Sequence, residues 1–339
     1  MYISEIKIKN IRCFEDFQIN FGKNCSTSLW TMITGDNSLG KTCLLRCIAL
    51  GLCDEASAAA LMKELKGQFI RREAISDNGE QEGTIEISLK TKRNTDPYKI
   101  ITDIKKKSPN APEKVSQRTE PEDGFPWKEI FVCGYGPHRA LFADSSQEEY
   151  SSLEAVYTLF NNDAHLQNPE LVLNRQETMF RDWLAGKLLT ILMLDGENKK
   201  IKFAKKGMLV PGPWGALPFE VLSDGYRSTI NWVTDFFGWL IYTEKIHMDQ
   251  EEYEGILLID ELVQHLHPRW QRHIVEILKE QFPKVQFIST THSPLILFSA
   301  QKKVHFFLFI NLYSIKTNFQ FLLTQYSFGE ISNNLNISF

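Results

Sequence analysis

One stretch of eight residues, Gly35–Thr42, limits the possible folds of this chain more than any other. It reads Gly-Asp-Asn-Ser-Leu-Gly-Lys-Thr, which fits the pattern GxxxxGK[ST], and it follows the mostly apolar run Leu29–Thr34. Glycine lets the backbone curl so that N–H groups point at phosphate oxygens, and a helix that begins there adds its positive dipole end. The pattern predicts a buried strand, a phosphate-binding loop, and a helix from Lys41 to about Lys66.

The same stretch carries the groups that bind a nucleoside triphosphate and its metal. Lys41 is expected to reach the β- and γ-phosphates, and the Thr42 hydroxyl is expected to ligate Mg²⁺. ATP and Mg²⁺ are therefore the predicted cofactors. The predicted ATP-binding residues of the loop are Gly35, Asp36, Asn37, Ser38, Leu39, Gly40, Lys41 and Thr42.

A second motif is an acidic pair, Asp260 and Glu261, which ends the apolar run Gly255–Ile259. Carboxylates at the end of a buried strand need partners, because burying an unpaired charge is costly. Asp260 is suited to hold the Mg²⁺ shell through water, and Glu261 to orient or deprotonate the water that attacks the γ-phosphate. Such a pair alone fits a surface turn, but beside a phosphate-binding loop it indicates ATP hydrolysis.

Two weaker motifs complete the set. Ser223 and Gly225 lie in Leu-Ser-Asp-Gly-Tyr-Arg-Ser before a strongly apolar helix, where a Ser and a Gly form an anion site or an ordinary helix cap. His292 follows the apolar run Val285–Thr290 inside Thr-Thr-His-Ser-Pro. Taken singly, neither motif distinguishes function from local structure.

Strands alternate with helices along the chain, and the strands beside the motifs are apolar on both faces. This arrangement is typical of a parallel sheet covered by helices. Two antiparallel strands are expected at the start, at residues 5–9 and 17–21, and a helical pattern runs from 151 to 194. We therefore predict an α/β fold with a mostly parallel sheet, N-terminal antiparallel strands and a helical lobe. The predicted boundaries are 1–150 and 215–300 for a nucleotide-binding core, 151–214 for an inserted helical lobe, and 301–339 for an atypical tail.

Further elements are expected from the local patterns. Strands are predicted at Thr84–Lys92, Tyr98–Ile104 and Trp127–Gly134, a hairpin at 200–210, and helices at Ser228–Tyr242 and Pro268–Gln281. The stretch Lys105–Gly124 is expected to be a solvated loop or hairpin tip. The tail has seven Phe, no Asp and one Glu, and is expected to be either a terminal strand pair or a truncated or frameshifted end.

Composition narrows the class of protein. The formal net charge of −4 gives no support for strong attraction of the whole protein to nucleic acid, although Lys105–Lys107 and Lys199–Lys206 are local clusters. The cysteines form no CxxC pair and are expected to be reduced thiols in the cytoplasm. No secretory signal is evident, and no run of about 18 apolar residues predicts a membrane helix. The cysteines are Cys13, Cys25, Cys43, Cys47, Cys53 and Cys133.

The order of the motifs resembles that of the ABC-type ATPases, and more closely the branch with the SMC, RecF and overcoming-lysogenization-defect heads. The opening residues 3–21 are similar to the first strands of that branch. Residues 260–297 and 159–170 are very similar to its stand-alone bacterial AAA-family members. The resemblance covers roughly residues 1–300 and implies an ABC-type ATPase head.

In that family two heads sandwich two ATP molecules, which implies an ATP-dependent homodimer here. Ser223 and Gly225 would contact the γ-phosphate bound by the other protomer, His292 would be the switch histidine on that phosphate, and Arg12 would lie near the nucleotide. The stretch Tyr135–Arg139 replaces the glutamine loop of transporter heads, and no role is assigned to it. Val263 stands where the family often has an acidic residue.

The resemblance also leaves several functions open. Stand-alone members include ATPases of phage defence, among them Septu-type systems with a partner nuclease, so the leading hypothesis is an ATPase that controls an effector nuclease. A DNA-repair or chromosome-maintenance ATPase that binds DNA directly is the alternative. A transporter motor on a membrane permease is disfavoured by the missing glutamine loop, and an inactive fragment by the intact Lys41, Asp260 and Glu261. The chain itself shows no nuclease motif.

Overall fold

The structure is a computed structural model in which part of the chain is described. The described residues are 1–21, 29–36, 39–65, 68–72, 80–91, 97–108, 111–139, 142–143, 149–196, 199–204, 207–246, 248, 253–299, 305–309 and 324–326.

A mostly parallel sheet forms the centre of the molecule, as the sequence predicts. Its strand order is β14-β13-β3-β12-β11-β7, and neighbouring strands are parallel except β13 and β14. The strands are β3 (Trp30–Gly35), β7 (Val132–Tyr135), β11 (Gly255–Ile259), β12 (Val285–Thr291), β13 (His305–Phe309) and β14 (Thr324–Tyr326). The predicted strand Gly255–Ile259 matches β11 at both ends.

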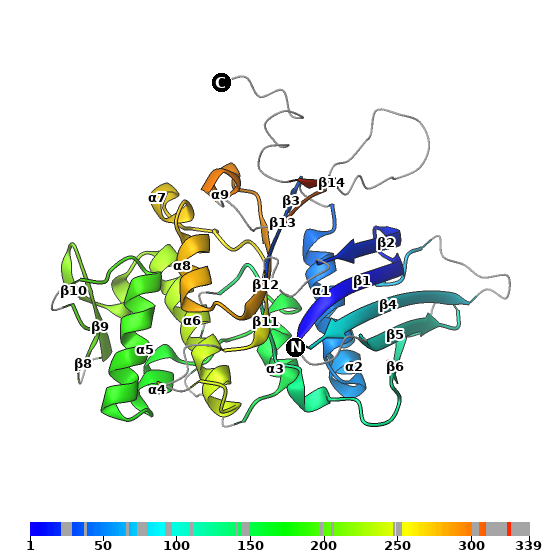
Figure 1. Cartoon of the computed structure of the whole chain (residues 1–339), viewed down its shortest axis with the longest axis horizontal. Coiled ribbons are helices and arrows are strands. Elements are labelled where there is room, and N and C mark those ends of the chain that lie inside the picture. The colour runs from blue at the N-terminus through cyan, green and yellow to red at the C-terminus, as the bar shows by residue number, and fades with distance from the viewer. Residues whose placement is uncertain are drawn as a thin grey trace, which may run out of the picture.

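The central strands β3, β11 and β12 are buried on both faces, and β11 is apolar at every position. On β11, Leu257 and Ile259 pack into one core, while Ile256 and Leu258 pack into the other. Figure 1 shows the sheet between α1 and the antiparallel strands on one side and α5, α6 and α8 on the other. These helices are α1 (Lys41–Leu52), α5 (Thr178–Ile191), α6 (Asp224–Tyr242) and α8 (Ile274–Gln281).

A second, antiparallel sheet covers the α1 side, with strand order β2-β1-β4-β5-β6. Its strands are β1 (Tyr2–Ile11), β2 (Phe14–Asn20), β4 (Gln81–Lys90), β5 (Tyr98–Lys106) and β6 (Lys114–Glu120). Of the two alternatives predicted for Lys105–Gly124, the hairpin is present, since β5 and β6 pair antiparallel and are joined within it, but a loop over the whole stretch is wrong because β6 lies there. The side chains of β6 are polar except Val115, and every second one is half-buried. Gln117 donates to the Leu50 and Cys53 carbonyls at the end of α1.

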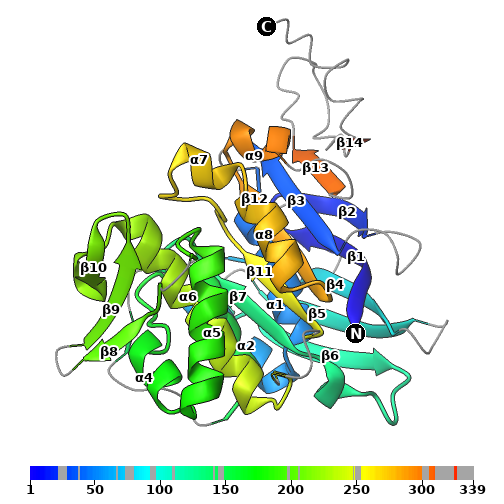
Figure 2. The ribbon, with the colours of Figure 1, turned by 60° about the vertical axis from the view of Figure 1, so that its left-hand side comes forward.

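At the end opposite the antiparallel sheet lie α4 (Pro169–Asn174) and the strands β8 (Lys202–Ala204), β9 (Gly207–Gly212) and β10 (Gly215–Pro218) (Figures 1 and 2). The short helix α3 (Ser152–Val156) lies against β7 and α2. The predicted hairpin at 200–210 is present as β8 and β9. The predicted boundary at 214/215 falls between β9 and β10, which pair with each other.

Two predicted helices are interrupted. The helix expected from Lys41 to Lys66 divides into α1 and α2 (Glu55–Glu64), because the Asp54 carboxylate caps a new helix by accepting from the Ser57 N–H at 3.0 Å. The helix expected at Pro268–Gln281 divides into α7 (Pro268–Gln271) and α8, and α9 (Pro294–Ser299) follows β12. Single-turn 3₁₀ helices occur at Trp127–Glu129, Tyr157–Leu159 and Phe219–Val221.

The predicted strand Trp127–Gly134 is correct only in its second half, since a 3₁₀ turn after Pro126 precedes β7. In the tail, β13 pairs with β3 and β14 pairs with β13, which corresponds to the expected terminal strand pair. The rest of 301–339 lies outside the described residues. Among the described helices none combines the length and apolar character that a membrane crossing requires.

Candidate functional site

The phosphate-binding loop connects β3 to α1, as predicted. Gly40 has a φ of +93°, and a Cβ atom there would lie 2.3 Å from the Cys13 sulfur. Glycine is therefore required at this position by both backbone conformation and space. Asn37 and Ser38, which the sequence also assigns to the loop, lie outside the described residues.

Lys41 lies at the start of α1 with its ammonium directed back into the loop. It donates to the carbonyls of Gly35 and Asp36, each at 2.9 Å, and the residue is only 6% exposed. Burial lowers the pKa of Lys41, while the charges of Glu261 and Asp260 oppose that change. The structure thus brings the predicted lysine and the predicted acidic pair into one electrostatic environment.

Asp260, directly after β11, joins two hydroxyl groups. Thr42 Oγ1 donates to Asp260 Oδ2 at 2.6 Å, and Thr290 Oγ1 donates to Asp260 Oδ1 at 2.5 Å. Mg²⁺ is commonly bound by one or two protein oxygens together with substrate phosphates, so a hydroxyl in contact with a carboxylate fits this ion. The described part of the chain has no group of three or more His, Cys, Asp or Glu residues that could hold a metal alone.

Glu261 is held by contacts on its backbone and on its side chain. Its φ is +50°, a left-handed conformation that is unusual for a residue with a side chain. Its N–H donates to Thr290 Oγ1 at 2.8 Å, and its Oε1 lies 3.2 Å from His292 Nε2. Burial raises the pKa of the Glu261 carboxyl, and the charge of His292 opposes that rise. The predicted Glu261 and His292 are therefore direct neighbours.

Two residues of this site were not assigned a role from the sequence. Thr290 is fully buried in β12, and its single hydroxyl connects Asp260 to Glu261. Arg139 follows β7, is 2% exposed, and donates through Nη2 to the Glu261 carbonyl at 2.7 Å. A hydroxyl at the carboxyl end of the strand next to the acidic strand is the signal that could have identified Thr290.

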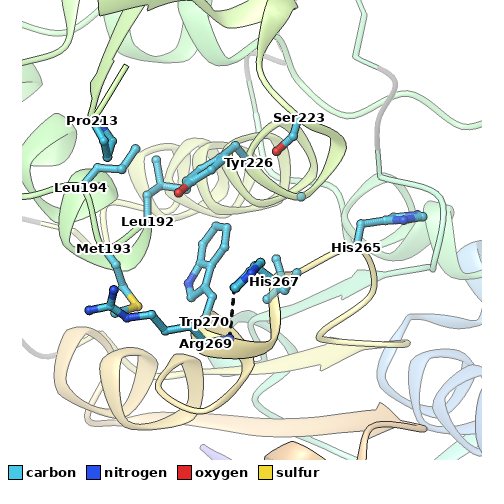
Figure 3. A pocket seen from close by; sticks show the side chains of 12 residues that line it. Leu192, Met193, Leu194, Pro213, Ser223, Tyr226, His265, His267, Arg269 and Trp270 are labelled. Atoms are coloured by element: carbon cyan, nitrogen blue, oxygen red, sulfur yellow. Dashed lines mark hydrogen bonds between the residues drawn. The ribbon is translucent and has the colours of Figure 1, made fainter. Parts of the chain in front are cut away.

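Ser223 and Gly225 lie elsewhere, in a pocket of about 590 Å³ that none of the described residues of the phosphate-binding loop lines. Ser223 is exposed, and its side chain accepts no capping hydrogen bond at the start of α6. A Cβ atom on Gly225 would lie 2.5 Å from the His265 carbonyl oxygen, so α6 begins in direct contact with the loop that follows Glu261. Figure 3 shows Ser223 on α6 and His265 and His267 on that loop.

Arg12 lies between β1 and β2, with a φ of +44°. Its N–H donates to the Phe69 carbonyl at 2.9 Å, and its guanidinium lies 5.4 Å from the centre of the Phe69 ring. The next residue, Cys13, is the one that a Cβ atom on Gly40 would meet. Arg12 is thus close in sequence to a side chain that touches the phosphate-binding loop.

Two lysines of the basic clusters lie beside carboxylates. Lys105 pairs with Glu82 at 3.1 Å across β5 and β4, and Lys200 lies 3.9 Å from Asp182. Lys205 and Lys206 lie outside the described residues.

A parallel sheet with a phosphate-binding loop, an acidic pair and a following histidine at the ends of its strands defines an ABC-type P-loop ATPase head. The family described as "AAA domain, putative AbiEii toxin, Type IV TA system" matches residues 31–297, and the chain belongs to that family.

Similar proteins agree with this class. The chain is 29% identical to Septu protein PtuA of Bacillus mycoides (strain KBAB4), with 87% of this chain and 39% of that protein covered. It is 43% identical to the Retron Vc95 probable ATPase of Vibrio cholerae serotype O1 biovar El Tor, with 22% of this chain and 15% of that protein covered. The chain therefore spans well under half the length of these curated relatives.

The fold is also found among solved structures. An SMC head bound to the C-terminal winged-helix domain of ScpA superposes with a TM-score of 0.53 at 14% identity, covering 91% of this chain and 94% of that chain. At this level of identity the likeness establishes the fold alone.

Proposed function

We propose that this chain binds and hydrolyses ATP with Mg²⁺, dimerises on ATP, and uses hydrolysis to control a partner protein. The observation that carries the proposal is the continuous set of contacts from Thr42 through Asp260 and Thr290 to Glu261, with His292 against the Glu261 carboxyl. These are the groups that ATP hydrolysis needs, and three separate segments of the chain supply them: the start of α1, the end of β11 and the end of β12.

The residues divide the chemical work as follows. Lys41 and the loop N–H groups bind the phosphates, and Thr42 and Asp260 hold Mg²⁺, which supplies charge stabilisation when bound. Glu261 accepts a proton from the attacking water, and its partial burial, which raises the pKa of its carboxyl, favours that role. His292 holds the Glu261 carboxyl in place and faces the γ-phosphate.

The dimer is proposed from the place of the signature residues. Ser223 is exposed in a pocket apart from the phosphate-binding loop, so it is available to a nucleotide held by a second copy. Ser223 and Gly225 would then complete the site of the other protomer, and Arg12 would lie near its own nucleotide. We also propose that the chain divides into a nucleotide-binding core (1–150 and 215–300), a helical lobe (151–214) and a tail (301–339).

The biological role is proposed from the relatives. Septu protein PtuA carries the name of the Septu-type defence systems, so the proposed partner is an effector, with a nuclease as the leading class. We place the protein in the cytoplasm, where Cys13, Cys43, Cys47, Cys53 and Cys133 would stay as the free thiols seen here. Direct DNA binding in repair is the alternative, but the ion-paired Lys105 does not favour it.

The test is ATP turnover measured against protein concentration, with size-exclusion chromatography in the presence and absence of ATP. Glu261→Gln should retain ATP binding, slow turnover by about 10²–10⁴-fold, and accumulate as a dimer on ATP. Lys41→Ala should lose nucleotide binding. Glu276→Gln and Lys279→Ala on α8, which pair with each other, are the matched controls and should behave as wild type.

Wild-type protein that is folded, binds ATP and does not turn it over at any concentration would contradict the hydrolytic proposal. Turnover linear in protein concentration, with no dimer of Glu261→Gln on ATP, would contradict the shared site alone. Binding of duplex DNA that weakens steeply between about 50 and 200 mM salt would favour the repair alternative.

A further inference from the structure

Glu261 has a backbone conformation that needs support. Its φ of +50° places it in the left-handed region, which is unfavourable for an L residue unless the surroundings hold it there. Its N–H donates to the Thr290 hydroxyl, and its carbonyl accepts from the Arg139 guanidinium at 2.7 Å and from the Gln264 N–H of its own loop at 3.1 Å. The direction of the Glu261 carboxyl therefore depends on two contacts outside its own strand.

Arg139 is itself fixed by its neighbours. It lies four residues beyond Tyr135, whose carbonyl accepts the Asp260 N–H at 2.8 Å where β7 pairs with β11. The Arg139 carbonyl accepts from Asn231 Nδ2 of α6 at 3.0 Å. The arginine thus reaches Glu261 from a segment anchored to both the sheet and α6.

The surroundings of the guanidinium argue against a purely structural role. Arg139 is 2% exposed, and among the described residues its Nε and Nη1 atoms have no hydrogen-bond partner. A buried cation with unpaired donors costs free energy of folding, which an apolar side chain of similar size would avoid. Burial lowers the pKa of Arg139 to about 10, with the carboxylates of Asp260 and Glu261 opposing, so it remains a cation at neutral pH.

We propose that Arg139 is a positioning residue for ATP hydrolysis, which holds the Glu261 backbone so that its carboxylate is directed at the attacking water. This inference rests on the proposed hydrolysis and assigns a role to a residue outside the recognised motifs. It acts through the Glu261 carbonyl and does not contact phosphate. Its loss should therefore reduce the rate of hydrolysis and leave ATP affinity and stability nearly unchanged.

The test compares Arg139→Met, Arg139→Lys and Arg139→Ala with wild type in kcat, KM, binding of a fluorescent ATP analogue, and Tm. Arg139→Met should lower kcat about 10- to 100-fold, the effect expected from one lost charge-assisted hydrogen bond, with ATP affinity within about twofold. Added guanidinium at millimolar concentration should partly restore the kcat of Arg139→Ala, whereas ammonium should not. Arg181→Met on α5, whose guanidinium lies 5.0 Å from the Phe203 ring centre, is the control and should retain wild-type kcat.

Several outcomes would overturn the inference. A wild-type kcat in folded Arg139→Met would do so, as would a loss of ATP affinity with kcat unchanged, because the residue would then be a phosphate ligand. If Arg139→Met does not fold, a wild-type kcat in Arg139→Lys, or the absence of guanidinium rescue in folded Arg139→Ala, would decide against it. Absence of turnover in the wild type would overturn the proposed function and this inference with it, whereas turnover that is lost in Glu261→Gln but unaffected at Arg139 would overturn this inference alone.

Discussion

Replacement of Thr290 by valine should show how much ATP hydrolysis depends on the orientation of Asp260 and Glu261, since both residues remain in the variant. Valine has nearly the same shape as threonine but no hydroxyl, and it would remove two hydrogen bonds at once: the one to Asp260 Oδ1 at 2.5 Å and the one from the Glu261 N–H at 2.8 Å. Both partners would then be left without this contact, at a residue that is 0% exposed. The acidic pair itself would be unchanged.

The size of the effect follows from these two contacts. A buried polar group left unsatisfied costs about 1–3 kcal/mol, so the free energy of unfolding should fall by roughly 2–4 kcal/mol and Tm by roughly 3–6 °C. Because the hydroxyl orients the carboxylate proposed to hold Mg²⁺, kcat should fall about 10- to 100-fold. Binding of the fluorescent ATP analogue should weaken much less, since Lys41 is untouched.

Turnover assays and thermal melts of three variants test this reasoning. Thr290→Ser keeps the hydroxyl and should keep most of kcat, losing only about 1 kcal/mol for the missing methyl group. Ser289→Ala is the matched control, because Ser289 is also fully buried in β12 and its hydroxyl has no partner among the described residues. Equal kcat in Thr290→Val and wild type, or equal losses in Thr290→Val and Ser289→Ala, would refute the assignment.

Two further predictions concern other buried positions. Gly225→Ala should lower the free energy of unfolding by about 1–3 kcal/mol in a denaturant titration, because its Cβ would lie 2.5 Å from the His265 carbonyl oxygen. Gly186→Ala is the control: its Cβ would meet nothing within 4 Å, so it should raise the free energy of unfolding by about 0.5–1 kcal/mol. An unchanged free energy of unfolding in Gly225→Ala would show that the close contact relaxes freely. Burial raises the pKa of Asp235 to about 6, above its ordinary 3.8, so the folded state binds this proton more tightly than the unfolded state and stability is lost as pH rises through this window. The stability of wild type relative to Asp235→Asn should therefore fall by at most about 3 kcal/mol between pH 4 and pH 7, and a difference independent of pH would contradict the assignment.

The sequence predicted correctly those features that a single short segment determines. The loop from Gly35 to Thr42 and the strand Gly255–Ile259 are specified by local pattern alone, and both lie where they were predicted. The central sheet could be predicted because the strands beside the motifs are mostly apolar. The adjacency of Asp260, Thr42 and Lys41 was implied by the function of the motifs and is present in the structure.

Other features depend on contacts between distant segments, which a single sequence does not reveal. Thr290 and Arg139 act on Glu261 because β12 and β7 are the two neighbours of β11, and strand order is not written in local periodicity. The strand β6 is polar and looked like a loop, yet pairing with β5 satisfies its backbone. The division between α1 and α2 was decided by one side chain, Asp54, within a stretch of uniform helical composition.

The absence of a side chain at Gly225 has a consequence for how this protein can change over time. With no atoms between α6 and the His265 carbonyl, the start of the signature helix and the loop that begins at Glu261 must shift together. In the proposed dimer, binding of a second head at Ser223 would thus displace the loop that carries Glu261 directly, with no other segment between them. A substitution in the loop that begins at Glu261 would then change both dimerisation and hydrolysis, so evolution could not adjust these two properties separately through this loop.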